Sequence, residues 1–331
     1  MCRDKETKLK IFHWASLLGA LLGSLLACNV RAQNLYVPYY YDSTVPHQDA
    51  YPMTATQPMY SYSYDPNLDT HKTPYVAPPA HQSANDLFQE ISLSTPSGLT
   101  GGFQITDYDY KEPGLDELSG PKAGLTLNGA GKFDNGFFLG VKMRYALGWS
   151  DYNGSGTSSG HFENLFDVRP YLGKDFVFST FSLSPYLGVG YRHLYSNDRG
   201  VTSTGDLGYR RTNNLIYLPF GVTPRFRVTD ESLISTNLEY DAVLSGIEMT
   251  KLSDVDPGLP GVHNQQSSGY GLRADVMWEH QDWGVGPFLI YWNIDQSNSV
   301  CASGSVYSGC GFYEPANSTL EGGLQLTYHF F

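Results

Sequence analysis

The stretch NSTLEGGLQLTYHFF, Asn317–Phe331, decides the fold of this chain. Every second residue from Leu320 to Phe330 is apolar or glycine, and most of the residues between them, such as Glu321 and Gln325, are polar. This period of two predicts a β-strand with one apolar face, because an amphipathic helix would repeat every 3.6 residues.

The aromatic end of this strand resembles the closing strand of bacterial outer-membrane β-barrels. It also resembles the C-terminal signal by which such chains are recognised for insertion. The resemblance implies that Tyr328, Phe330 and Phe331 form this signal, and that the barrel-assembly machinery is a partner during insertion. Phe331 departs from the pattern, because the signal normally ends on the outward row, to which Phe330 belongs.

The composition suits closely packed strands. Charged residues make up only 16% of the 331 residues, whereas there are 35 Gly and 25 Tyr. The net charge of −12 argues against a nucleic-acid partner, because phosphates would be repelled. Beyond the N-terminus, no apolar run reaches the roughly 18 residues that a membrane helix needs.

Residues 1–32 have the pattern of a signal peptide. A basic start precedes the apolar stretch Ile11–Ala27, and small residues precede a cleavage site after Ala32. Cleavage before Cys28, with lipidation of that cysteine, is the alternative. Either way we expect the protein to leave the cytoplasm.

Residues 33–85 are rich in Tyr and Pro and contain no run of Leu, Ile or Val that could build a core. We expect a disordered periplasmic segment. The alternative is a Tyr/Pro segment that contacts peptidoglycan or a periplasmic partner. The barrel domain then covers residues 86–331, and its first part, Asp86–Leu93, is either a short extra strand or a helical lead-in.

From about residue 99 onward, the alternating pattern repeats ten times. The clearest copy runs from Phe137 to Trp149, where large apolar residues alternate with a row that contains Lys142 and Arg144. This is the pattern of a strand between lipid and a polar lumen. The predicted strands are about 99–110, 121–132, 137–149, 162–173, 181–195, 213–225, 233–245, 268–279, 285–295 and 317–331. The fold class is therefore all-β: an antiparallel up-and-down transmembrane β-barrel of ten strands, within a range of eight to twelve.

The predicted connections alternate between short and long. The long ones include Asp151–His161, Ser196–Thr212, Gly246–Ser267 and Gln296–Ala316. This asymmetry is typical of bacterial outer-membrane barrels, with long loops extracellular and, for an even strand number, both termini periplasmic. Cys301 and Cys310 lie in the last long loop, and an even pair in an exported protein predicts a disulfide.

Several shorter pieces resemble a known group of proteins. These are SPYLGVGYR (Ser184–Arg192), YLPFGV (Tyr217–Val222), EYDAVLSG (Glu239–Gly246) and SGYGLR (Ser268–Arg273). Together with the aromatic C-terminus they resemble uncharacterised bacterial outer-membrane β-barrel proteins, loosely grouped with opacity-protein and OmpA-like barrels. The resemblance covers about Leu99 to Phe331 and concerns architecture more than activity.

The inward rows are expected to carry charges of both signs. We interpret them as a salt-bridged lumen plug, because side chains fill a narrow barrel and pairing offsets their desolvation. A catalytic or translocation site is the alternative. The residues of this predicted lumen network are Lys122, Lys142, Arg144, Glu163, Asp167, Arg169, Arg192, Glu239, Asp241, Arg273, Asp275 and Glu321.

Two histidines are candidate catalytic residues, each for a different kind of hydrolase. An omptin-like protease would use His263 with Asp254 or Asp256, and a lipid A deacylase would use His193. Neither has the surrounding motif of its family, so we expect no catalytic site, no metal and no cofactor.

The sequence thus predicts an outer-membrane barrel with a structural or surface-interaction, adhesin-like role, in contact with outer-membrane lipid and lipopolysaccharide. A small porin-like channel is the first alternative and an outer-membrane hydrolase the second.

Overall fold

The computed structural model describes residues 91–330. The signal peptide, the Tyr/Pro segment and Phe331 therefore lie outside the described residues. The elements are β1 (Gly98–Glu112), β2 (Asp116–Lys132), β3 (Phe137–Asn153), β4 (Thr157–Lys174), β5 (Phe176–Val177), β6 (Phe181–Gly188), β7 (Gly190–Asn197), β8 (Arg210–Thr229), β9 (Ser232–Lys251), the short 3₁₀ helix η2 (Leu252–Asp254), β10 (Gly261–Gln265), β11 (Gly269–His280), β12 (Trp283–Ile294), β13 (Val300–Ser303), β14 (Ser308–Phe312) and β15 (Asn317–His329).

Within residues 91–330, no helix is both long enough and apolar enough to cross a membrane.

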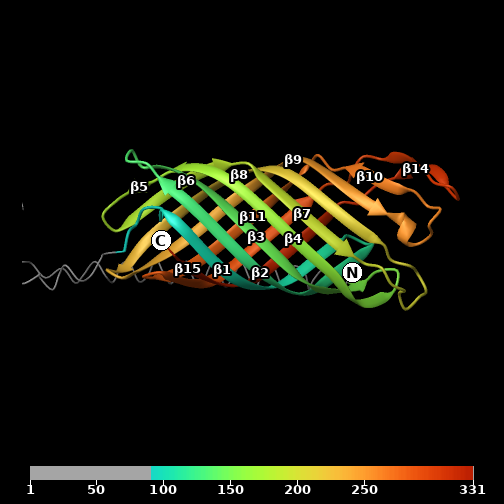
Figure 1. The fold of residues 1–331 in the computed structure, drawn as a ribbon, viewed down its shortest axis with the longest axis horizontal. Coiled ribbons are helices and arrows are strands. Elements are labelled where there is room, and N and C mark those ends of the chain that lie inside the picture. The colour runs from blue at the N-terminus through green and yellow to red at the C-terminus, as the bar shows by residue number, and fades with distance from the viewer. Residues whose placement is uncertain (1–90, 331) are drawn as a thin grey trace, which may run out of the picture. The chain divides into compact units, whose positions relative to one another are not determined.

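Ten strand positions form a closed antiparallel ring. The order around the ring is β1, β2, β3, β4, the pair β6 and β7, β8, β9, β11, β12 and β15. β6 and β7 occupy one position, because the ladder is interrupted only at Val189, whose N–H bonds the carbonyl of Pro170 (3.1 Å). The prediction of a ten-stranded up-and-down barrel is confirmed, and Figure 1 shows the strands crossing the barrel obliquely.

The C-terminal strand closes the ring. On one side of β15, Leu324 pairs with Ile105 of β1; on the other side, the same residue pairs with Pro287 of β12. Every edge of the ring is then hydrogen-bonded, which a closed barrel achieves and an open sheet does not.

The outer face of the ring is apolar and exposed. Phe103 is 48% exposed, Leu125 62% and Leu326 46%, although each belongs to a regular strand. Aromatic side chains also contact one another, for example Trp283 with Tyr328 next to the turn at residues 281–282, and Tyr240 with Tyr270. An outer face of exposed apolar and aromatic side chains is suited to the hydrocarbon and interface of a membrane.

The strands extend well beyond this apolar face. β8 and β9 each contain 20 residues, about twice what a strand needs to span a bilayer. The predicted loop Asp151–His161 is therefore wrong, since β3 and β4 continue through it to a turn at residues 154–156. The alternation of apolar and polar residues ends where the strands extend out of the lipid. The hydrogen bonds between the strands continue beyond that point, so the strands are longer than the alternation predicts.

The two ends of the barrel differ in their connections. At the end that we name the short-turn end, strands join through residues 133–136, 230–231 and 281–282. At the opposite, long-loop end, the connections include residues 198–209, 252–268 and 295–316, the last of which contains the β13–β14 hairpin. Figure 1 shows β10 and β14 at the long-loop end and β5 at the other.

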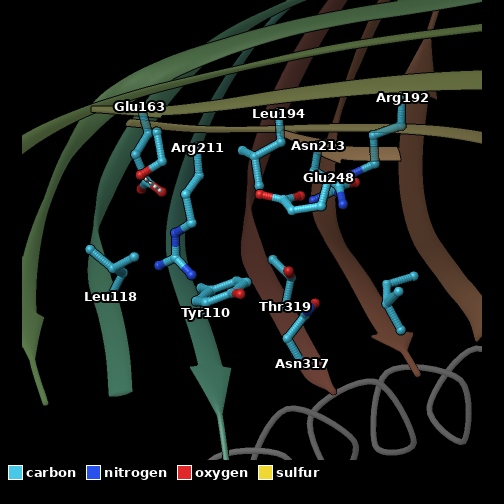
Figure 2. Close-up of a pocket in the computed structure, with 12 residues that line it drawn as sticks. Tyr110, Leu118, Glu163, Arg192, Leu194, Arg211, Asn213, Glu248, Asn317 and Thr319 are labelled. Atoms are coloured by element: carbon cyan, nitrogen blue, oxygen red, sulfur yellow. Dashed lines mark hydrogen bonds between the residues drawn. The ribbon is translucent and has the colours of Figure 1, made fainter. Parts of the chain in front are cut away.

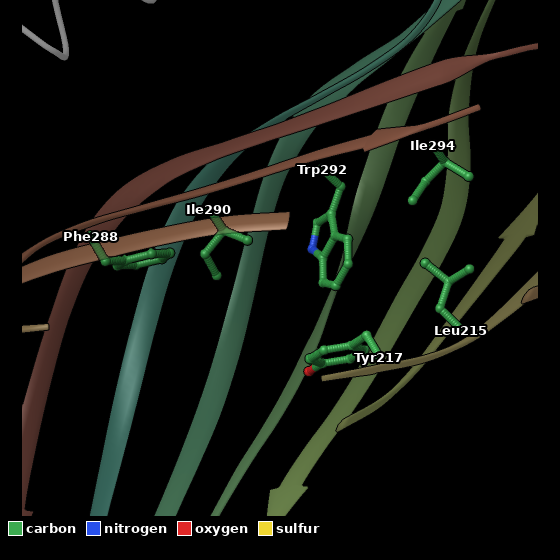
Figure 3. Packing of buried hydrophobic residues seen from close by; sticks show 6 residues of the cluster. All are labelled: Leu215, Tyr217, Phe288, Ile290, Trp292 and Ile294. Atoms are coloured by element: carbon green, nitrogen blue, oxygen red, sulfur yellow. The ribbon is translucent and has the colours of Figure 1, made fainter. Parts of the chain in front are cut away.

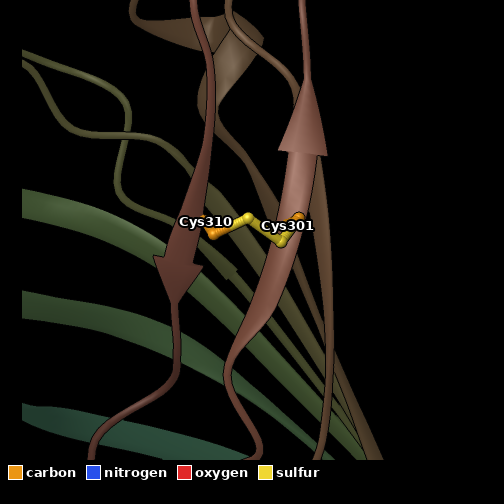
Figure 4. Close-up of a disulfide and its surroundings, with 2 residues drawn as sticks. All are labelled: Cys301 and Cys310. Atoms are coloured by element: carbon orange, nitrogen blue, oxygen red, sulfur yellow. A yellow bond between two sulfur atoms is a disulfide. The ribbon is translucent and has the colours of Figure 1, made fainter.

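A disulfide joins Cys301 of β13 to Cys310 of β14, which are directly paired across the hairpin with their Cα atoms 3.8 Å apart (Figure 4). The structure thus contains the disulfide expected from the sequence.

The segment before β1 lies across the short-turn end. Ser182 donates a hydrogen bond to the carbonyl of Leu93 (2.6 Å), and Leu93 is only 3% exposed. The backbone N–H and hydroxyl of Thr95 both bond the carboxylate of Asp175, at 2.8 and 2.7 Å. Residues 91–93, the described part of Asp86–Leu93, form neither a strand nor a helix.

Candidate functional site: the lumen

The lumen is lined by the inward rows of the ten strands. Nine of the twelve charged residues predicted to face it are buried, and Lys142, Arg169 and Asp275 are partly buried. They come from strands far apart in the sequence, so the tertiary structure alone determines which charges pair. The buried nine are Lys122, Arg144, Glu163, Asp167, Arg192, Glu239, Asp241, Arg273 and Glu321.

At mid-height, two arginines are held by three carboxylates; we name this set the central cluster. Arg273 bonds Asp167 and Asp241, both at 2.7 Å, and lies 3.2 Å from Glu239. Arg169 pairs with Asp167 (3.2 Å) and with Glu239. Because each carboxylate meets a guanidinium, the desolvation of the charges is offset by charge-assisted hydrogen bonds.

Hydroxyl and amide groups complete the central cluster. The Tyr217 hydroxyl donates to Asp167 (2.8 Å) and the Tyr186 hydroxyl to Glu239 (2.5 Å). The ammonium of Lys142 lies 3.3 Å from both the Tyr186 hydroxyl and Asn237. A buried ionic network is stable only if its remaining lone pairs are also satisfied, and these groups satisfy many of them.

Two further ion pairs in the lumen join β3 to β15 and β2 to β4. Arg144 forms a double hydrogen bond with Glu321, and its Nε also donates to Gln104 (2.8 Å). Lys122 bonds Glu163 (2.8 Å), and each of these two side chains is only 1% exposed. Glu321 was expected on the inward row of the C-terminal strand, and its partner on β3 could not be read from the sequence.

Aromatic and aliphatic residues pack beside the charged groups. Phe138, Tyr171 and Tyr186 pack together, with Tyr171 and Tyr186 5.4 Å apart between ring centroids. A second apolar cluster contains Leu215 and Tyr217 of β8 and Phe288, Ile290, Trp292 and Ile294 of β12 (Figure 3). Together the aromatic and charged layers occupy the barrel interior.

The sequence interpretation missed the inward row of β12. A signal was present, because the segment Val285–Ile294 is apolar on both faces. Such a run indicates a strand that is buried on one side and lipid-exposed on the other.

A cluster of acids around Arg211 was also missed, because its members lie near the long-loop end, where alternation is lost. Arg211 pairs with Glu112 and Glu314 and lies 3.6 Å from Asp198. Glu314, in the connection before β15, lies outside the membrane-spanning part, and burial raises the pKa of its carboxyl to about 8. We name Arg211, Glu112, Glu314 and Asp198 the outer cluster.

A small, water-sized cavity of about 30 Å³ lies between Arg211 of the outer cluster and Glu163 (Figure 2). Its walls are part polar and part apolar. The lining residues are Tyr110, Leu118, Glu163, Arg192, Leu194, Ser196, Arg211, Asn213, Glu248, Ile294, Asn317 and Thr319.

The two hydrolase hypotheses find little support in the geometry. The carboxylate of Asp254 is bonded to Arg210 at 2.6 and 2.7 Å, and Asp256 accepts from the N–H of Gly258. Neither Asp254 nor Asp256 forms a hydrogen bond or ion pair with His263 in the described part of the chain. His193 lies beside Asn214, 2.8 Å from its Oδ1. Among residues 91–330, no three or more His, Cys, Asp or Glu side chains are grouped to hold a metal ion.

The closed ring, the apolar outer band and the ion-paired lumen define a transmembrane β-barrel of the kind found in bacterial outer membranes. No protein-family model matches the sequence, and no curated protein matches it.

Solved structures with a similar architecture include the outer-membrane protease OmpT from Escherichia coli, at 10% identity and a TM-score of 0.47, covering 73% of this chain and 100% of that one. The transport unit of the autotransporter AIDA-I from Escherichia coli has 11% identity and a TM-score of 0.41, covering 75% and 95%. The attachment invasion locus protein Ail of Yersinia pestis has 13% identity and a TM-score of 0.25, covering 71% and 100%. These scores are too low to carry an argument about function.

Proposed function

We propose that the protein is a closed barrel of the bacterial outer membrane, with a structural and surface-interaction role rather than a transport role. The observation that carries the proposal is the packed lumen. The central cluster, the Arg144–Glu321 pair and the aromatic layers fill the space that a channel would leave to water. Barrels of about eight strands have just enough interior for their own side chains, and two more strands add little.

The short-turn end supports the same conclusion. The segment Ile91–Thr95 is tied to the wall by Ser182 and Asp175, and the guanidinium of Arg227 donates to the carbonyl of Ile91 (3.2 Å). This segment lies where a solute would have to leave the lumen.

We further propose that the long-loop end faces the outside and that the termini are periplasmic. Long loops are the extracellular feature of such barrels, and a disulfide such as that of the β13–β14 hairpin persists both in the periplasm and at the cell surface. Exposed apolar side chains on these loops, including Val201 (62%), Val306 (63%) and Tyr307 (49%), are suited to surface contacts.

Single-channel recording in planar bilayers tests the closed lumen. Purified, folded full-length protein is expected to give no reproducible conductance steps. Heat-modifiable gel mobility of the same sample shows that the barrel is folded. Regular steps from folded protein would contradict the proposal and favour the channel.

Cysteine labelling of intact cells tests the orientation. Ser203→Cys, in the connection 198–209, is expected to react with a membrane-impermeant maleimide, whereas Asp282→Cys, in a short turn, reacts only after the outer membrane is permeabilised. The opposite labelling pattern would reverse the orientation.

A further inference from the structure

The β13–β14 hairpin has a strand edge that is not paired. β14 pairs with β13 along one edge, and no strand among residues 91–330 pairs with its other edge. The neighbouring short strand β10 differs, because the backbone N–H and carbonyl of Gln265 both bond Asn298, at 2.7 and 3.0 Å. β14 therefore presents a free edge at the long-loop end (Figure 1).

Two residues of β14 direct their backbone hydrogen-bonding groups to this free edge. The Cα atoms of Cys301 and Cys310 lie only 3.8 Å apart, which is the close approach of an antiparallel pair without mutual backbone hydrogen bonds. The N–H and carbonyl of Cys310 therefore point away from β13. Ser308, two residues along the strand, points the same way. The turn agrees with this alternation, because the N–H of Gly304 bonds the carbonyl of Tyr307 (2.8 Å).

The hairpin is fixed to the rest of the long-loop end, so its free edge is preformed. The disulfide joins its two strands. The side-chain Nδ2 of Asn264 donates to the carbonyls of Asn298 and Phe312, at 2.9 and 3.0 Å. The N–H of Val306 bonds the carbonyl of Gly258 (3.0 Å). A preformed edge loses little conformational entropy when another strand is added to it.

The free edge lacks the side chains that usually prevent strand addition. Exposed edges are commonly protected by charged residues, by proline or by a covering segment. The sequence of β14, SGCGF, contains neither charge nor proline, and the whole segment 296–313 contains no charged residue. The small side chain of Ser308 and the absence of one at Gly309 allow a second backbone to approach closely.

Charge favours a second copy of this chain as the partner of the edge. The chain has a net charge of −12. The exposed charged side chains at the long-loop end are mainly acidic, with Asp151, Asp206, Asp256 and Asp295 against Arg199 and Lys251. Two such ends repel each other except where the uncharged segment 296–313 meets its counterpart. An antiparallel strand pair about a twofold axis is self-complementary, so the same edge serves both copies.

We propose that β14 pairs antiparallel with β14 of a second copy in an apposed outer membrane, so that the protein joins cells that carry it. The edge is short and a single contact is weak, so many copies on each surface act together. The exposed side chains of Val306, Tyr307 and Tyr313 beside the edge add apolar contact. The inference rests on the proposed function, with the long-loop end outside, and it names the partner of the surface-interaction role.

Mixing of fluorescent cell populations tests the identity of the partner. Bacterial cells that display the full-length protein, one population red and one green, should form mixed clumps, and cells without the protein should be excluded from them. Clumps that include cells without the protein would identify a different surface component as the partner. Absence of clumping by cells that display folded protein would show that the edge does not pair. Either result overturns the proposal.

Charged variants at Ser308, whose side chain is exposed, test the edge itself. Ser308→Lys and Ser308→Glu each place like charges on both copies, which interact over roughly 30 Å at about 0.01 M salt. Each population alone should then clump about fivefold less or weaker still, and a mixture of the two should regain most of the clumping. The matched control is Ser159→Lys, at an exposed serine of β4 near the same end, which should clump normally. Unchanged clumping of both Ser308 variants would contradict the assignment.

Two further measurements separate this inference from the proposed function. Heat-modifiable mobility shows that each variant is folded, and labelling of Ser203→Cys on intact cells shows that the long-loop end is outside. If Ser203→Cys is not labelled, the proposed orientation is wrong and the inference is wrong with it. If Ser203→Cys is labelled and the cells remain separate, the orientation is right and only the pairing of β14 is wrong.

Discussion

Arg144 of β3 and Glu321 of β15 form a doubly hydrogen-bonded ion pair inside the barrel, with Nη1 3.2 Å from Oε1, although β1 and β2 lie between their strands. The pair links the third strand of the ring to the strand that closes it. Both side chains are almost completely buried, at 4% and 1% exposure. The Arg144–Glu321 ion pair therefore both fills part of the lumen and holds the closing strand to the rest of the barrel.

Removal of one partner of this pair should be costly. Glu321→Leu leaves the Arg144 guanidinium buried and uncompensated, and we expect a loss of about 3–5 kcal/mol in the free energy of unfolding. Adding Arg144→Met to Glu321→Leu should restore most of this loss, because a well-packed apolar pair avoids the desolvation cost. Urea unfolding in lipid vesicles, followed by heat-modifiable mobility, measures both.

Arg199→Gln is the control for that experiment, and a change within about 0.5 kcal/mol is expected for this surface site. If the single and double variants lose the same stability, the two residues are not coupled and the pair contributes little.

Whether the apolar outer face contacts lipid can be tested by introducing a charged residue on it. Leu125 of β2 and Leu115 of the β1–β2 turn are similarly exposed, at 62% and 58%. In lipid, Leu125→Lys should cost about 2–4 kcal/mol if the residue lies near the bilayer midplane. Leu115→Lys should cost less than about 0.5 kcal/mol, because it lies in water. Equal, small effects in vesicle-embedded protein would mean that residue 125 does not face hydrocarbon.

The disulfide should stabilise its hairpin and not the barrel. For a loop of this size, chain entropy gives about 2.5–3 kcal/mol of local stabilisation. In Cys301→Ser/Cys310→Ser, we expect faster proteolysis within residues 300–312 and unchanged heat-modifiable mobility. Loss of the folded-barrel band in the double variant would show that the hairpin is needed for barrel folding.

The long-loop end should respond to pH. Burial, opposed by Arg211 and reinforced by Glu248 and Glu112, raises the pKa of the Glu314 carboxyl to about 8, from an ordinary value of 4.5. For an acid with a raised pKa in the folded state, the stability contributed by the protonated form is fully present below 4.5 and is lost as pH rises through about 8. The connection around Glu314 should therefore become more open between pH 5 and pH 8.

Hydrogen–deuterium exchange of residues 308–318, corrected for the intrinsic pH dependence, measures this opening. Glu314→Gln stays neutral and should show equal protection at both pH values. A pH response that persists unchanged in Glu314→Gln would assign the effect to another group.

The strands that face lipid were predictable because each carries its own signal. From Phe137 to Trp149, lipid on one side and the lumen on the other force alternation, and the alternation identifies both faces. The outer ends of the strands lack such a signal, whereas the inward row of β12 was missed although its apolar residues were visible in the sequence. β8 begins at Arg210 and β9 extends to Lys251, but the outer ends of both strands lie in water. Because either face of a strand can be polar in water, the residues there do not alternate between apolar and polar, and the sequence does not reveal that they are paired in a strand.

The sequence by itself determined the strand number, the inward or outward direction of the clearly alternating rows such as Phe137–Trp149, and the expectation of charges of both signs in the lumen. Only the tertiary structure decided which charges meet, because a barrel brings together inward rows that are far apart in the sequence, such as those of Arg144 and Glu321, which are 177 residues apart. Whether a buried arginine meets a carboxylate depends on the heights of the two residues along the barrel axis. These heights are set by the register and tilt of the strands around the whole ring.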